Sequence, residues 1–119
     1  MTQLSQYFKR EEFACKDGCG ACNIEPELIG VLEDIRQYFG RPVIIVSGYR
    51  CESHNRNVGG ASNSQHLLGA ASDFNIKNVS LKAIADYLEL KYPNKYGIGR
   101  YKTFIHIDVR NYKARWGHN

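Results

Sequence analysis

Three side chains that can bind a divalent metal ion stand out in this sequence: His66, Asp73 and His106. Two imidazoles and one carboxylate form a known catalytic ligand set for zinc, in which a fourth position stays open for water. His66 and Asp73 belong to the run Ser64–Asp73, which reads SQHLLGAASD, and His106 belongs to Phe104–Asp108, which reads FIHID. The sequence therefore predicts one metal site built from these two segments.

Bringing the ligands together requires a bend in the chain between His66 and Asp73. Seven extended residues span roughly 23 Å, whereas the donor atoms of two ligands of one ion lie about 3–4 Å apart. Gly69 lies between them and permits a sharp bend. Residues 71–76 then alternate loosely as a strand does, and residues 104–109 alternate more clearly. Two adjacent strands are expected to present Asp73 and His106 side by side.

Two helices are expected to support these strands. The first begins at Pro26, which suits the first helical turn, and ends at Gly40. Its apolar side chains fall at helical spacing: Leu28, Val31, Leu32, Ile35 and Phe39. The second begins at the N-cap residue Ser80 and ends before Pro93, with an apolar face of Leu81, Ile84, Ala85 and Leu88. A short helical turn within residues 4–14 is expected to pack Phe8 and Phe13.

The remaining strands complete the predicted fold. The apolar, β-branched run Val43–Ser47 predicts a central strand. Residues 97–101 and 104–110 predict a hairpin, and we interpret Trp116 in the tail as a packing anchor. The order of elements predicts an α+β domain, in which helices pack on a small, mainly antiparallel sheet.

Six short motifs run through the chain in this order: Ser47-Gly48-Tyr49-Arg50, His54-Asn55, Gly59-Gly60, Ser64-x-His66-x-x-Gly69-x-Ala71-x-Asp73, Gly97-Ile98-Gly99-x-Tyr101 and His106-x-Asp108-x-Arg110. Together they resemble the M15 family of zinc peptidases, the D-alanyl-D-alanine carboxypeptidases and related cell-wall peptidases. The resemblance covers residues 4–116 and is greatest to the small single-domain branch of phages, prophages and bacterial genomes.

The resemblance implies a fold, a cofactor and an activity. The fold is the hedgehog/D-alanyl-D-alanine peptidase-like α+β fold, as a single domain over residues 1–119. The cofactor is one catalytic zinc ion bound by His66, Asp73 and His106. The activity is hydrolysis, by a metal-activated water, of peptide bonds that involve D-amino acids in peptidoglycan stem or cross-link peptides. Carboxypeptidase and endopeptidase activity both remain open.

Three residues of the long polar segment 48–65 are further candidates for the site. The resemblance implies that Arg50 binds substrate or the oxyanion, and a guanidinium can hold a carboxylate through two hydrogen bonds; the alternative is an ion pair with a structural acid. Ser64 is implied to bind substrate or order its loop, and the alternative is a loop cap. His54 is a candidate proton carrier and substrate-binding residue, because an unperturbed histidine has a pKa near 6.5; the alternative is a loop-ordering role.

The general base is where this chain departs from the better-known branches of the family. Those branches place Glu or Asp three residues before the last histidine, and this chain has Thr103 there. Asp108 is the best substitute, because it shares a strand face with His106. Two other roles for Asp108 stay open: orienting a ligand histidine, or forming an ion pair with Arg110 or Arg50.

Four cysteines could form a second, structural zinc site: Cys15, Cys19, Cys22 and Cys51. One or two disulfides are a second interpretation, which requires an oxidising compartment. Reduced, partly buried thiols are the third.

Composition narrows the function classes. The chain has 119 residues, of which 43% are hydrophobic, and a formal net charge of +4 from scattered basic residues, so we expect no nucleic-acid partner. No apolar run has the length of a membrane helix or a signal peptide, so we expect synthesis in the cytoplasm, no membrane partner and a monomer. Something else would then have to bring the protein to the cell wall, and in this it resembles a phage lysis enzyme (endolysin) or a virion-associated wall-cutting protein. The alternative function is a non-catalytic zinc-containing module, either cell-wall-binding or a phage structural component, because position 103 lacks an acid.

Overall fold

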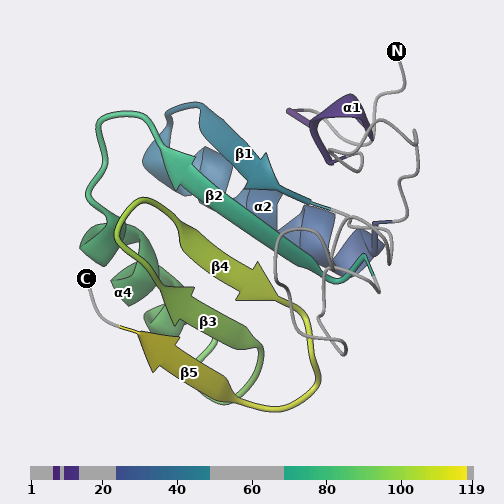
Figure 1. The fold of residues 1–119 in the computed structure, drawn as a ribbon, viewed down its shortest axis with the longest axis vertical. Coiled ribbons are helices and arrows are strands. Elements are labelled where there is room, and N and C mark those ends of the chain that lie inside the picture. The colour runs from purple at the N-terminus through teal and green to yellow at the C-terminus, as the bar shows by residue number, and fades with distance from the viewer. Residues whose placement is uncertain (1–6, 9, 14–23, 49–68, 118–119) are drawn as a thin grey trace.

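Two helices pack on one face of a five-stranded sheet (Figure 1). The computed structural model describes residues 7–8, 10–13, 24–48 and 69–117, and every structural statement below concerns these residues. The strand order in the sheet is β1-β2-β4-β3-β5. The elements are α1 (Arg10–Phe13), α2 (Pro26–Phe39), β1 (Val43–Ser47), β2 (Ala71–Ile76), α4 (Leu81–Lys91), β3 (Gly97–Arg100), β4 (Ile105–Asp108) and β5 (Ala114–Gly117).

Both long helices begin and end where their terminal residues predict. Pro26 occupies the first turn of α2, and Gly40 ends the helix in a left-handed conformation with φ 64°. The Oγ of Ser80 accepts a hydrogen bond from the backbone N–H of Ala83 at 3.1 Å and so caps α4. Their buried faces contain Leu28, Ile29, Val31, Leu32 and Ile35 in α2, and Ile84, Ala85 and Leu88 in α4. None of the helices described is long and apolar enough to span a membrane.

The sheet is mainly antiparallel, as expected. Antiparallel pairing joins β1 to β2, β2 to β4, and β4 to β3. Phe8 and Phe13, at the N-terminal turn, are buried with their ring centroids 5.8 Å apart, as also predicted. The α+β architecture inferred from the order of elements is therefore confirmed.

Two expectations about the strands are wrong. Residues 43–47 form an edge strand rather than a central one, because β1 lies at the end of the described strand order and pairs there with β2. Ile44 and Val46 remain 48% and 42% exposed. The tail contains β5, which we did not expect, and this strand pairs in parallel with β3. A four-residue strand that depends on a distant partner carries little local signal of its own.

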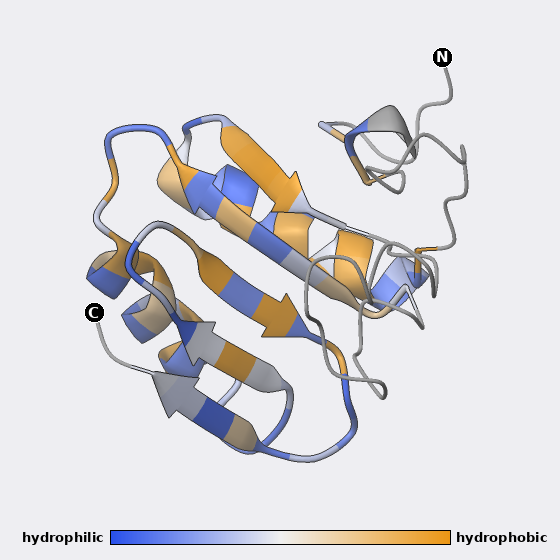
Figure 2. Cartoon of the chain, in the orientation of Figure 1, coloured by the Kyte–Doolittle hydropathy of each residue, from blue (hydrophilic) through white to orange (hydrophobic). Residues whose placement is uncertain are grey.

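The two faces of the sheet have different chemistry. On β4, Ile105 and Ile107 belong to the core under the helices, while His106 and Asp108 point to the opposite side, which we call the front face. On β2, Phe74 lies in the core and Asp73 on the front face. Figure 2 shows this alternation as changes of colour along both strands. The apolar core thus fixes the register that places the polar side chains.

Substitution by alanine should change the free energy of unfolding in opposite directions at Gly30, inside α2, and at Gly40, the residue that caps it. Gly40 has φ 64°, so Gly40→Ala should lower the free energy of unfolding by about 1 kcal/mol. Gly30 lies inside the helix, and no atom lies within 4 Å of the position that an alanine Cβ would take, so Gly30→Ala should raise it by about 0.5–1 kcal/mol. Urea denaturation measures both changes. Changes of the same sign would contradict the assigned end of the helix.

Candidate metal centre

Asp73 and His106 are directly paired on neighbouring strands. They are register partners in the antiparallel ladder of β2 and β4, and His106 Nδ1 lies 2.9 Å from Asp73 Oδ1. Gly69, which precedes β2, has φ 70°, the left-handed conformation expected at the bend. The alternation of the two strands thus produces the juxtaposition that it predicts.

The second nitrogen of His106 contacts the other front-face carboxylate of β4. His106 Nε2 lies 2.7 Å from Asp108 Oδ2, and Asp108 is completely buried. Arg110 pairs with Asp108 through two bonds of 2.7 Å, from Nε to Oδ1 and from Nη2 to Oδ2. The backbone N–H of Gly97 donates to Asp108 Oδ1 at 3.1 Å. His106 and Asp108 of β4 and Arg110, just after the strand, therefore form one connected row.

Strand β3 makes room for this row by carrying glycine at its front-face positions. A Cβ at Gly97 would overlap the Asp108 carboxylate, and a Cβ at Gly99 would lie 2.5 Å from Trp116 Nε1. The Trp116 ring stands 5.1 Å from the His106 ring, centroid to centroid. Sequence reasoning assigned no role to either glycine and missed the contact of Trp116 with His106. The pattern Gly-x-Gly on a strand was the available signal.

The electrostatics of the row favour a protonated His106 between two ionised carboxylates. Burial acts to lower the pKa of His106, but hydrogen bonds with Asp108 and Asp73 outweigh it and raise that pKa above 6.5. Burial acts to raise the pKa of Asp108, but hydrogen bonds from His106 and Arg110 hold it well below its usual range. When His106 is protonated, its imidazolium can donate one hydrogen bond to Asp73 and one to Asp108.

The same arrangement fits a divalent metal ion in place of one proton. Because Nε2 contacts Asp108, Nδ1 is the nitrogen that can coordinate an ion beside Asp73. The 2.9 Å between Nδ1 and Asp73 Oδ1 is close to the roughly 3.3 Å expected between two ligands of one tetrahedral zinc ion. A carboxylate behind a metal-binding histidine is a common way to fix its orientation.

Several predicted site residues lie outside the described residues. They are His66, the third predicted metal ligand, together with Arg50, His54, Ser64, Cys15, Cys19, Cys22 and Cys51. Within residues 7–8, 10–13, 24–48 and 69–117, no group of three or more His, Cys, Asp or Glu side chains can hold a metal ion. Of the three roles considered for Asp108, the contacts with His106 and Arg110 are observed, and the role of general base stays a prediction.

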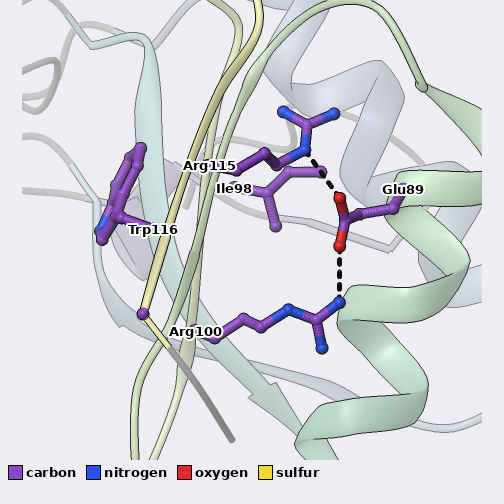
Figure 3. A pocket seen from close by; sticks show the side chains of 6 residues that line it. Glu89, Ile98, Arg100, Arg115 and Trp116 are labelled. Atoms are coloured by element: carbon purple, nitrogen blue, oxygen red, sulfur yellow. Dashed lines mark hydrogen bonds and ion pairs between the residues drawn. The ribbon is translucent and has the colours of Figure 1, made fainter.

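A hollow of about 400 Å³ lies beside β3 and β5 and is lined by Glu89, Ile98, Arg100, Arg115, Trp116 and Gly117. Figure 3 shows that Glu89 and the Arg115 side chain lie on one side of β5 and the Trp116 ring on the other. Glu89 accepts hydrogen bonds from Arg100 at 2.6 Å and from Arg115 at 3.1 Å. Arg115 also donates to four backbone carbonyls. These contacts attach the edge of the sheet to α4, away from the front face.

Comparison with known proteins gives two findings. The family model described as Peptidase M15 matches residues 6–108. A zinc D-Ala-D-Ala carboxypeptidase of Streptomyces albus G is 38% identical over 55 residues, which cover 45% of this chain and 22% of that protein. The aligned segment therefore spans about a fifth of the length of this curated relative.

Replacing Asp108 by asparagine should weaken both the fold and zinc binding. Asp108→Asn leaves the charge of Arg110 without its partner, so we expect a loss of about 2–4 kcal/mol in the free energy of unfolding. It also removes the anion behind His106, so zinc affinity should fall about 10- to 100-fold. Urea denaturation and competition with a chelator measure the two effects. Asp34→Asn is the matched control, because Asp34 pairs with Tyr87 and Lys91 between the helices. Equal zinc affinity in both variants would contradict the role of Asp108.

The raised pKa of His106 predicts opposite pH trends with and without zinc. Zinc must displace the proton from Nδ1, so its affinity should fall at least about tenfold per pH unit below that pKa. In the metal-free protein the protonated ring stabilises the fold. That contribution is complete below about pH 6.5 and is lost as the pH rises through the raised pKa. Calorimetric zinc titration and denaturation of the metal-free protein test these trends. Equal zinc affinity at about pH 5 and pH 7.5 would refute the assignment of His106 as a ligand.

Proposed function

The chain belongs to the peptidase M15 family, and from this premise we propose that it is a zinc-dependent metallopeptidase that hydrolyses peptide bonds in peptidoglycan stem or cross-link peptides. The observation that carries the proposal is the Asp73–His106 pair on adjacent strands, with Asp108 behind the imidazole. The name of the Streptomyces albus G relative supports zinc as the metal and D-amino-acid peptides as the substrate.

Asp73, His106 and His66 would hold the ion. When bound, zinc supplies a water of lowered pKa and a Lewis acid that polarises the peptide carbonyl. Asp73 contributes its carboxylate, and His106 contributes Nδ1 while its Nε2–H donates to Asp108. Arg110 and the Gly97 N–H keep Asp108 ionised and in place, so the imidazole cannot rotate away from Asp73.

The contacts and burial of Asp108 bear on whether this residue is the general base. Both oxygens of Asp108 already accept hydrogen bonds, and the residue is completely buried. We therefore propose that Asp108 orients His106 rather than acting as the base. Among the predicted site residues, His54 is then the candidate for proton transfer, because histidine is the side chain whose unperturbed pKa lies closest to neutral pH. Arg50 would bind a substrate carboxylate or the developing oxyanion.

A second candidate function is a zinc-containing module that binds cell wall without cutting it. The observation that favours it is Thr103, an exposed residue at the position where better-known branches of the family have an acid. Its backbone carbonyl accepts a hydrogen bond from Asn75 Nδ2 at 3.4 Å. A threonine hydroxyl does not accept a proton at neutral pH.

Incubating the zinc-loaded protein with purified peptidoglycan distinguishes the two functions. We expect new amino and carboxyl ends at bonds that involve D-amino acids, which mass analysis of the fragments identifies. His106→Ala should lose zinc and activity together, because it removes Nδ1 from the centre. Lys82→Ala, which alters an exposed ion pair on α4, should keep both. A zinc-loaded wild-type protein that binds peptidoglycan but releases no fragments would favour the binding module.

A further inference from the structure

Three aromatic side chains form a wall beside the metal centre on the front face: Trp116, Tyr101 and Phe104. The Trp116 ring lies 5.1 Å from the His106 ring, and Trp116 Nε1 donates to the Tyr101 hydroxyl at 2.8 Å. Tyr101 stacks on Phe104 with ring centroids 4.5 Å apart and an interplanar angle of 18°. The three rings thus extend from His106 toward the turn between β3 and β4.

The Tyr101 hydroxyl has hydrogen-bonding capacity left over. Its oxygen accepts from Trp116, which leaves its own hydrogen to donate. That hydrogen meets no acceptor among the residues that the structure describes. Tyr101 is 39% exposed, so a ligand can reach it. The wall therefore presents one hydrogen-bond donor, the Tyr101 hydroxyl, which lies between apolar ring surfaces.

The Tyr101 hydroxyl, as a hydrogen-bond donor, complements the acceptors on the rest of the described front face. Asp73 and Asp108 are acceptors, and the Arg110 guanidinium is committed to Asp108 through two hydrogen bonds. A peptide substrate brings carbonyl oxygens, which need donors. The Trp116 ring lies 5.1 Å from the His106 ring, and its Nε1 lies 2.8 Å from the Tyr101 hydroxyl. The hydroxyl is therefore on the order of 10 Å or less from His106, a span that two or three extended residues cover.

Resting on the proposed function, we propose that the aromatic wall is a subsite for the stem peptide two or three residues from the bond that is cut. Tyr101 donates its hydroxyl hydrogen to a backbone carbonyl of the substrate, and the rings of Trp116 and Phe104 receive the methylene groups of the side chain beside that carbonyl. Trp116 is a positioning residue, because its Nε1–H fixes the Tyr101 hydroxyl. Gly99 leaves the space in which the indole lies. The protein therefore recognises a longer peptide than the two residues that flank the bond.

Substrate length separates this subsite from a purely structural role. The test uses a five-residue stem peptide ending in D-Ala-D-Ala and an N-acetylated D-Ala-D-Ala dipeptide. Tyr101→Phe removes the hydroxyl and keeps the stacked ring. For the pentapeptide we expect KM to rise about tenfold with kcat within about twofold, as for one lost hydrogen bond. KM for the dipeptide and zinc affinity should not change. Trp116→Phe should change KM in the same direction, because it removes the donor that fixes Tyr101.

Tyr38→Phe is the matched control. Tyr38 stacks on Tyr87 at 3.9 Å in the helical layer, so this change also removes a hydroxyl from a stacked pair. Unchanged kinetics of Tyr101→Phe on both peptides, or equal losses on both, would overturn the subsite. If the wild-type protein cuts neither peptide, carboxypeptidase action fails, and the release of fragments from purified peptidoglycan decides the proposed function separately. Calorimetric binding of the pentapeptide to the zinc-loaded protein then decides: tenfold weaker binding by Tyr101→Phe supports the subsite, and equal binding overturns it.

Discussion

The carboxylate of Asp108 is completely buried, and its charge has to be compensated within the sheet. Its partners are close in the chain or in the sheet: His106 lies two residues before it on β4, Arg110 lies two residues after it, just beyond β4, and Gly97 lies opposite on β3. Because the charge attracts the Nε2–H of His106, the other ring nitrogen faces Asp73. One buried charge thus determines which nitrogen of His106 faces Asp73 and would bind the ion in the proposed metal centre.

The same strands connect this centre to the rest of the fold. On its front face β3 carries only glycines, which leave space for a carboxylate and for the Trp116 ring. On its other face, Ile98 enters the core and Arg100 pairs with Glu89 of α4. Glu89 also binds Arg115 of β5. Packing against the helices therefore holds the register of the strands, and that register holds the distances between the front-face side chains.

Sequence periodicity and capping were sufficient for much of this fold. They predicted α2, α4, β2 and the β3–β4 hairpin, and strand alternation predicted that Asp73 lies beside His106. The prediction of a central strand at Val43–Ser47 was wrong, because apolar residues on both faces of a strand also occur in an edge strand. The role of Asp108 could not be read from spacing, since a base, an orienting residue and an ion-pair partner all share the face of His106. The contact distances and the burial of Asp108 support the orienting role that we propose for it.

The central claim is that His106 presents Nδ1, and Asp73 its carboxylate, to one shared metal ion. Anomalous X-ray diffraction at the zinc edge from crystals of the zinc-loaded protein tests it most directly. The account predicts a single strong peak about 2.0–2.2 Å from both His106 Nδ1 and an Asp73 oxygen, with Nε2 still bonded to Asp108. A peak bound to Nε2, or no peak between these two side chains, would contradict it.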